Sequence, residues 1–155
     1  MNTVLQWYVK QFAELSVEEL LGILRLRQDV FIIEQDCIYP DIDDLDQSSV
    51  HVFAKEQGGD VVACTRLVPP SLKYKEPSVG RVVVAQSHRK DGCGVELMQR
   101  SIAESERLYP GQGNRIGAQL YLNKFYRSLG YENVSDEYDE DGIPHIDMFR
   151  ASSME

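Results

Sequence analysis

The sequence is short of cysteine, of long apolar runs and of any N-terminal targeting pattern. Its three cysteines, Cys37, Cys64 and Cys93, are too few and too scattered for a disulfide framework, and no pair has metal-ligand spacing. An odd number of cysteines is typical of a reducing compartment. No apolar run approaches the roughly 20 residues that a membrane span needs, and Met1 to Lys10 lacks the cationic and apolar blocks of a secretion signal. We therefore expect a cytoplasmic protein that does not enter a membrane.

Basic residues are also scarce, because 16 lysines and arginines stand against 25 aspartates and glutamates, which gives a formal charge of −9. Binding to nucleic acid needs clustered positive charge, so this composition argues against it. An acidic protein attracts cationic partners instead, and amines are cations at neutral pH. The sequence has no internal repeat and no low-complexity tract, and 155 residues is the length of one ordinary domain. We expect a single domain over residues 1–155.

The pattern of apolar residues predicts alternating strands and helices. Ser16 and Glu19 form a capping-box pattern that starts the first helix, and a polar, aspartate-rich loop should follow at residues 34–46. The expected helices cover residues 17–31, about 93–109 and 121–129. The expected strands cover residues 5–10, 51–54, 61–68, 80–85, 115–118, 131–134 and 143–150.

Two turns help to order these elements. Gly58-Gly59-Asp60 predicts a hairpin between the second and third strands, and an acidic turn around Asp141-Gly142 should close a hairpin of the last two strands. The order of elements predicts an α/β fold with a mixed central sheet flanked by helices.

The segment from Val84 to Gly94 combines features that favour an anion site. A β-branched strand enters it and a helix leaves it, and Gly92 and Gly94 let the backbone approach a ligand closely. The N–H groups at the start of the helix point one way and carry partial positive charge, to which Arg89 and Lys90 add full charges. The segment therefore predicts a site for a phosphate or pyrophosphate.

Other glycine motifs fit this segment less well. A dinucleotide fingerprint requires a third glycine where this chain has Leu97, and the Gly-Lys-Ser/Thr of a P-loop is missing. The remaining alternative is a glycine-rich turn that only starts a helix.

A second segment, further along the chain, favours the ligand site. Arg89-x-x-Gly92-x-Gly94 followed by Phe125-Tyr126-x-x-x-Gly130-Tyr131 resembles the GNAT (GCN5-related N-acetyltransferase) superfamily. The likeness extends to its ElaA-type subfamily through Arg27-x-x-Val30-Phe31-Ile32-Ile33-Glu34-Gln35 and the tail from Tyr138 to Ile146, with Tyr39, Asp43 and His51 between them. The resemblance therefore covers nearly the whole chain.

The resemblance implies acetyl-coenzyme A as the co-substrate and no metal. In this superfamily the strand before the loop splays from its neighbour and pairs with the pantetheine arm, which here would involve Val82, Val83 and Val84. The pyrophosphate would lie on the amides of the loop and helix start, which are those of Arg89, Lys90, Asp91, Gly92, Cys93 and Gly94.

The resemblance also implies roles for residues near the second motif. Tyr126 occupies the position of the superfamily's general acid, and a phenol, whose pKa is near 10, can protonate a departing thiolate. The alternative is a core tyrosine on an amphipathic helix. Many relatives carry a cofactor-binding asparagine seven residues earlier, where this chain has Gln119. Asn123, one helical turn before Tyr126, should face either the cofactor or solvent.

An amine acceptor, whether a small molecule or a peptide, must lose a proton to a base or a water chain. The candidate bases are Glu34, His51 and His145. Each has a structural alternative. Glu34 could be a surface carboxylate at a helix end, and His51 could simply start a strand. His145, which follows Pro144, could be a structural histidine whose hydrogen bonds are made within the protein.

Two further patterns suggest other chemistry. Cys93 at a helix N-terminus would allow a covalent acyl-enzyme, although a small residue between glycines more often only packs.

The chain also has a cluster of aspartates that suggests a calcium site: Asp41, Asp43, Asp44 and Asp46. An EF-hand loop that starts at Asp41 would need a glycine at 46 and a glutamate at 52, where this chain has Asp46 and Val52. We expect instead a solvated loop that borders the acceptor pocket and attracts a cationic substrate.

The leading hypothesis is an N-acetyltransferase in which an amine attacks the thioester directly. A non-catalytic acyl-CoA-binding or sensor module is the second, and it would need no proton donor at Tyr126. The third hypothesis is an acyltransferase similar to the acyl-homoserine-lactone synthases, which take acyl chains from a carrier protein. It rests on two segments that also resemble those enzymes, Arg27-x-x-Val30-Phe31 and Arg66-Leu67-Val68-Pro69. The intact glycine loop favours coenzyme A, and a homodimer is left open.

Overall fold

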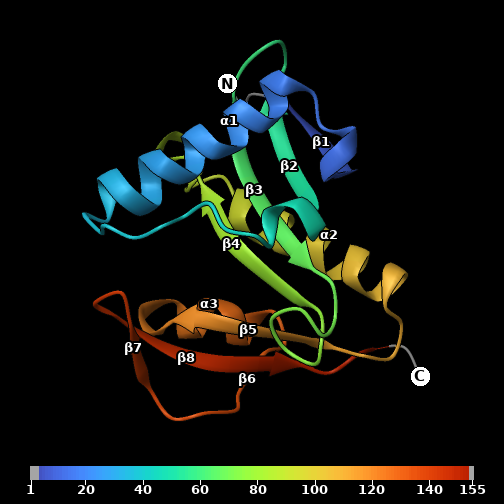
Figure 1. Ribbon diagram of the computed structural model, residues 1–155, viewed down its shortest axis with the longest axis vertical. Helices are drawn as coiled ribbons and strands as arrows, with labels where there is room; N and C mark the ends of the chain where they lie inside the picture. The colour runs from blue at the N-terminus through green and yellow to red at the C-terminus, as the bar shows by residue number, and fades with distance from the viewer. Residues whose placement is uncertain (1–3, 154–155) are drawn as a thin grey trace.

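The computed structural model describes residues 4–153, which fold into two β-sheets with helices packed against them (Figure 1). The first sheet contains β1 (Leu5–Gln11), β2 (Val50–Glu56), β3 (Val61–Val68) and β4 (Ser78–Val84) in that order. The second contains β5 (Asn114–Gln119), β6 (Glu132–Asn133), β7 (Tyr138–Glu140) and β8 (Ile143–Arg150), with β5, β6 and β7 each paired to β8.

The first sheet is an antiparallel meander, as its turn signals predict. Residue pairs such as Phe53 with Cys64 set the register between β2 and β3, and all eight residues of β3 are buried. A bulge interrupts the pairing of β3 with β4, where Arg81 and Val82 both lie opposite Thr65. Arg81 has a φ of 48°, in the left-handed region that a non-glycine residue seldom occupies. The bulge therefore marks a strained point in the middle of β4.

The first helix begins as predicted but ends differently. In α1 (Val17–Arg27) the Glu19 amide donates to Ser16 Oγ, and the Ser16 amide donates back to Glu19 Oε1, so the capping box is confirmed. The expected α-helix to residue 31 is wrong, because the chain changes to a π-helix, η2 (Gln28–Glu34), in which the Gln35 amide donates to the carbonyl of Val30. Such wider turns are rare in proteins as a whole, but those that occur are often found at functional sites.

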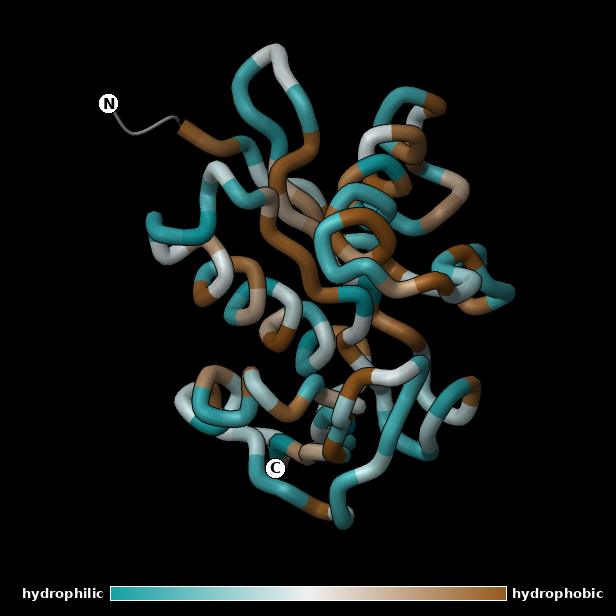
Figure 2. The backbone as a smooth tube through the Cα atoms, turned by 90° about the vertical axis from the view of Figure 1, so that its left-hand side faces the viewer, coloured by the Kyte–Doolittle hydropathy of each residue, from teal (hydrophilic) through white to brown (hydrophobic). Residues whose placement is uncertain are grey.

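Helices α1 and α2 (Cys93–Leu108) cover opposite faces of the first sheet (Figure 1). Ile23 and Leu26 of α1 pack on one face with Phe53, whereas Leu97 of α2 packs on the other with Val52. In Figure 2 hydrophilic and hydrophobic residues alternate along the helices, while a largely hydrophobic strand runs through the middle of the molecule. No helix within residues 4–153 has the length and apolar character that crossing a membrane requires.

The second sheet differs from the expected hairpin. The expected turn at Asp141 and Gly142 is confirmed, and β6 pairs with β8 as expected. The turn, however, joins β8 to an additional strand, β7, whose Tyr138 pairs with His145. Both turn residues have positive φ, 52° and 83°, as the tight hairpin turn requires. The short helices η5 (Leu120–Leu122) and α3 (Asn123–Ser128) replace the single helix expected at 121–129. Pairing with β8 stabilises β7 although its own residues are polar.

Strands β4 and β5 touch at one end and diverge at the other. At their starts the Arg115 amide donates to the Pro77 carbonyl and the Val79 amide donates to Asn114 Oδ1. Beyond this point the two strands belong to separate sheets and separate toward Val84 and Gln119 (Figure 1). The predicted α/β class is confirmed, with the correction that the central sheet is split into two halves, and a cavity lies where they separate.

Candidate functional site

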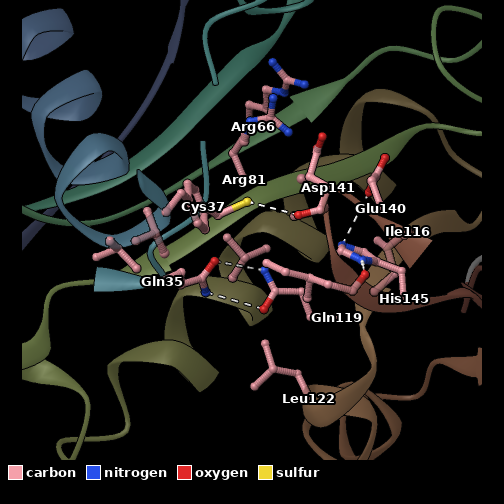
Figure 3. A pocket seen from close by; sticks show the side chains of 18 of the residues that line it. Gln35, Cys37, Arg66, Arg81, Ile116, Gln119, Leu122, Glu140, Asp141 and His145 are labelled. Atoms are coloured by element: carbon pink, nitrogen blue, oxygen red, sulfur yellow. Dashed lines mark hydrogen bonds and ion pairs between the residues drawn. The ribbon is translucent and has the colours of Figure 1, made fainter. Parts of the chain in front are cut away.

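A cavity of about 930 Å³ lies where β4 and β5 diverge. One end, which we call the α2 end, is lined by Val82, Val83, Val84, Arg89, Gly94, Leu122, Phe125 and Tyr126. The other, which we call the hairpin end, is lined by Cys37, Tyr39, Asp43, Arg66, Lys73, Arg81, Glu140, Asp141, Ile143 and His145. Figure 3 shows that the hairpin end brings together side chains from both sheets and from the segment after η2.

Strand β4 exposes part of its backbone to the α2 end. The Ala85 amide donates to Val62 on the neighbouring strand, so the preceding Val84 directs its own N–H and C=O to the opposite edge, toward the cavity. The Val84 carbonyl accepts a hydrogen bond there from Arg89 Nε, at 3.1 Å. The predicted residues of β4 therefore present a strand edge that the second sheet does not pair.

The loop before α2 holds the helix N-terminus beside this strand edge. Gly92 caps the helix with a φ of 72°, and the first N–H groups that follow have no partner within the helix. His88 anchors the loop, since its ring is buried and its Nε2 lies 3.0 Å from Glu56 Oε1. Lys90 and Asp91 are exposed next to the cavity and do not line it.

Gly94 and Cys93 face opposite ways at the start of α2. A Cβ built at Gly94 would lie 3.7 Å from Phe125 Cζ and 3.8 Å from Val84 Cγ2, so it would fill the space between the helix, β4 and α3. Cys93 turns into the core with Leu97 instead, and burial raises the pKa of its thiol. A buried, protonated thiol packs, and it is a poor nucleophile.

Arg89 and Glu34 form a two-pronged ion pair at the α2 end. Arg89 Nη1 lies 2.6 Å from Glu34 Oε2, and Nη2 donates to Oε1 at 2.9 Å. The hydrogen bonds from Arg89 lower the pKa of Glu34, so this carboxylate is a weaker base than an ordinary glutamate. The π-helix positions this pair, because Glu34 is its last residue.

Tyr126 lines the cavity from α3 and is 5% exposed. Phe125 and Tyr131 pack edge-on against its ring, with centroid distances of 5.2 and 5.9 Å. Its hydroxyl forms no hydrogen bond within residues 4–153 and is not one of the fully buried polar atoms there, so it faces the cavity. Burial raises the pKa of this phenol, so it stays protonated at neutral pH and is able to donate a proton.

The two predicted amides have different surroundings. Gln119 at the end of β5 lines the cavity and exchanges two hydrogen bonds with Gln35, at 3.3 and 3.4 Å, which bridges the gap between β5 and the end of η2 (Figure 3). Asn123 does not line the cavity, because its side chain donates to Asn133 Oδ1 at 2.7 Å. The geometry supports only Gln119 as a cavity residue.

His145 is held at the hairpin end by three contacts. Its Nδ1 lies 2.7 Å from the carbonyl of Ile143, its Nε2 lies 3.3 Å from Glu140 Oε2, and its ring stacks on Tyr138 with a centroid distance of 5.9 Å. Because a carbonyl only accepts, Nδ1 carries a hydrogen, and Nε2 is the basic nitrogen of the neutral ring.

His51 lies away from the cavity, inside β2. It is 1% exposed, and its Nε2 bonds to the backbone carbonyl of Asp46 at 2.9 Å. Burial lowers the pKa of this imidazole and keeps it neutral. His51 therefore holds the loop before β2 in place and does not face a ligand.

The aspartate-rich segment is not the solvated loop that we expected. Asp41 and Asp46 are buried and bind Arg27, itself 1% exposed, whose Nε donates to Asp41 at 2.8 Å and whose Nη1 donates to Asp46 at 2.7 Å. Burial by itself would raise the pKa of Asp46, but the hydrogen bonds and charges of Arg27 and Arg66 outweigh it and bring that pKa to about 2. The ion pairs of these two carboxylates with Arg27 hold the aspartate-rich segment against α1.

The same network extends to the wall of the cavity. Arg66 Nη2 donates to Asp43 at 2.9 Å, and Arg81, on the bulge of β4, lies 2.9 Å from Asp41 Oδ1. Three arginines thus face three aspartates, so the network as a whole is neutral. The expectation that this segment borders the pocket holds for Asp43, but its charge is already compensated.

The sequence did not predict several cavity residues as site residues, although Gln35 and Arg66 belong to motifs that carry the family resemblances. Arg81, Arg66 and Gln35 reach the cavity only because a bulge, a sheet register and a π-turn direct them there. Glu140 had a usable signal: an Asp-Gly pair flanked by alternating residues predicts a hairpin that brings Glu140 close to His145.

Comparisons with known proteins agree with this geometry. A family described as Acetyltransferase (GNAT) domain matches residues 14–151. The crystal structure of an acyl-CoA N-acyltransferase from Pseudomonas aeruginosa superposes with a TM-score of 0.90 at 37% identity, over 96% of this chain and 100% of that one. Protein ElaA of Escherichia coli is 35% identical over 95% of this chain and 97% of its own length, and its crystal structure gives a TM-score of 0.89.

A more distant likeness concerns the third hypothesis. The crystal structure of the AHL synthase LasI has a TM-score of 0.74 over 96% of this chain and 90% of that one. At 14% identity this likeness shows a common fold and nothing about the donor of the acyl group.

Proposed function

The chain belongs to the GNAT acetyltransferase family, in its ElaA-type branch, and from this premise we propose that it transfers an acetyl group from acetyl-CoA to an amine. Family and fold support an acyltransferase as such. The observation that carries the finer proposal is the cavity between β4 and β5, which combines an unpaired strand edge, a helix N-terminus and a buried phenol.

The α2 end fits the donor. Acetyl-CoA supplies a thioester, an amide-rich arm and a pyrophosphate. Val82 to Val84 offer backbone groups to the arm, and the helix start from Arg89 to Gly94 offers amides to the pyrophosphate. The absence of a side chain at Gly94 supports this assignment, because a Cβ would occupy the space beside Val84 and Phe125. Gln119 can supply a further amide from β5.

Tyr126 is the proposed general acid. Its phenol is protonated, lines the cavity and has no protein partner within residues 4–153 that would hold its proton back. The hydroxyl faces the cavity, where it is available to a ligand, which favours a functional hydroxyl over a packing one.

His145 is the proposed base, selected by comparing the three candidates. His51 is buried away from the cavity, and Glu34 is bound by Arg89 through both oxygens. His145 lines the cavity, and its Nε2 is the basic nitrogen because Nδ1 faces the Ile143 carbonyl, so a lone pair is available there to take a proton.

The test is to incubate the protein with acetyl-CoA and a panel of amines that includes alkylamines, diamines, amino acids and peptides. We expect free thiol to appear only with an accepted amine, in equal amount to an amine product heavier by one acetyl group in the mass spectrum. Tight binding of acetyl-CoA without thiol release from any amine would instead indicate a binding module.

A further inference from the structure

The hairpin end of the cavity contains carboxylates without cationic partners. Glu140 and Asp141 line the cavity, and neither forms an ion pair with a lysine or arginine in the part of the chain that is described. The other carboxylates of the cavity wall differ, since Glu34 binds Arg89 and Asp43 binds Arg66. Uncompensated negative charge in the cavity is therefore concentrated at the turn between β7 and β8.

One cation lies in the same region. Lys73 lines the cavity with its ammonium 5.6 Å from the centre of the Tyr74 ring, and it forms no ion pair within residues 4–153. The charge of Glu140 acts on this lysine, and Asp141 adds a second negative charge to the cavity wall, so the region keeps an excess of negative charge. A ligand group that binds there gains most when it is cationic.

Glu140 and His145 present two hydrogen-bond acceptors to the same space. Nδ1 of His145 must carry a hydrogen because it faces the Ile143 carbonyl, so the neutral ring has its lone pair on Nε2, 3.3 Å from a Glu140 oxygen. An ionised carboxylate also only accepts. Two acceptors at this distance repel unless a donor with positive charge joins them, which is either a proton on Nε2 or a ligand with several N–H groups.

We propose that Glu140 and His145 together bind the ammonium group of the acceptor, and that the acceptor is a primary amine with no carboxylate close to its nitrogen. This inference rests on the proposed function. A primary ammonium has three N–H groups, enough to donate to both residues at once. A carboxylate close to the nitrogen would be repelled by Glu140 and Asp141. The cations of the cavity wall are already engaged, since Arg66 and Arg81 bind aspartates and the charge of Lys73 is offset by that of Glu140.

The same pair accounts for the fate of the proton. The ammonium must lose two protons to become an amide. Nε2 of His145 takes the first, and the free amine then attacks the thioester carbonyl. As the C–S bond breaks, the departing thiolate takes the proton of Tyr126, and the second N–H proton leaves the nitrogen and returns to the Tyr126 oxygen through water. An amide and a thiol result, and no further reactant is needed. Glu140 then faces an imidazolium, whose positive charge it stabilises.

Propylamine and β-alanine provide matched probes, because they differ only by a methyl group in place of a carboxylate. We expect wild-type kcat/KM to be at least tenfold higher for propylamine. In Glu140→Gln the KM for propylamine should rise about five- to tenfold, as the loss of a charged hydrogen bond to a half-exposed carboxylate implies. The KM for acetyl-CoA should not change, and Glu140→Asp should recover part of the loss.

Glu137→Gln is the control, because Glu137 is exposed just before β7, does not line the cavity and should leave all constants unchanged. Equal or better use of β-alanine, or an unchanged KM for propylamine in Glu140→Gln, would overturn the inference while amine acetylation itself stands. If no amine of the panel is acetylated, the proposed function fails as well.

Discussion

The two ends of the cavity are built in different ways. At the α2 end, backbone groups of β4 and of the start of α2 form the surface, and Gly94 shapes it by having no side chain. At the hairpin end, side chains from separate segments form the surface, among them Arg66, Arg81 and His145. A backbone site depends on few residue identities, whereas a side-chain site depends on every partner in its network.

This difference has an energetic side. The arginine–aspartate network places Arg27 and Asp46 almost out of contact with water, which is favourable only while every charge keeps its partners. A mutation in the network should therefore destabilise the fold, and a mutation at the α2 end should weaken binding in a stable protein. The predictions below separate these outcomes.

The largest effect is expected at Tyr126, which lines the α2 end and is the proposed general acid. Tyr126→Phe should lower turnover about 10²- to 10⁴-fold, the usual contribution of a general acid. Affinity for acetyl-CoA should change little, because proton donation stabilises the transition state only. Because burial raises the pKa of Tyr126, wild-type activity should not fall through phenol ionisation until pH exceeds the ordinary tyrosine range. Turnover and calorimetric affinity, compared across pH, check this.

Tyr131→Phe is the matched control for that experiment. Tyr131 is also buried, but its hydroxyl bonds to Asn114 Oδ1 at 2.8 Å and does not line the cavity. This variant should lose about 1 kcal/mol of stability and keep its turnover. Near-normal turnover in Tyr126→Phe, measured where chemistry limits the rate, would mean that Tyr126 only packs.

The next effect concerns stability and is expected in the arginine–aspartate network that reaches the hairpin end through Arg66 and Arg81. Arg27→Ala leaves Asp41 and Asp46 buried without their main partner, so the free energy of unfolding should fall by about 3 to 5 kcal/mol. Arg100→Ala removes an exposed ion pair with Glu96 and should cost less than about 1 kcal/mol. Urea denaturation measures both. Similar losses in the two variants would mean that the network does not anchor the segment from residue 35 to 49.

The smallest effect is expected at Glu34. If the donor's pyrophosphate uses Arg89, Glu34 competes for the same guanidinium, so Glu34→Gln should bind acetyl-CoA about two- to fivefold more tightly, an effect limited by the exposure of the pair. Turnover should persist, because this carboxylate is not the base. Weaker binding would indicate that Glu34 positions Arg89 for the ligand, and lost turnover would restore Glu34 as the base.

The sequence predicted the local features of this molecule better than the distant ones. The strand, loop and glycines from Val82 to Gly94 are consecutive, so their pattern was visible along the chain. The buried role of Asp41 and Asp46 was missed because it depends on Arg27, whose partners lie 14 and 19 residues away. The π-turn of η2 and the bulge at Arg81 result from packing between elements, and local propensity does not encode them.

The measurement that tests the central claim most directly is a calorimetric titration of acetyl-CoA into wild type, Gly94→Val and Ala103→Val. Both variants add the same residue to α2, but Gly94 lines the cavity and Ala103 is exposed. If acetyl-CoA binds at the α2 end, Gly94→Val should lose at least tenfold in affinity, while Ala103→Val binds as wild type and both remain folded. Equal affinity in a folded Gly94→Val protein would contradict the placement of the coenzyme.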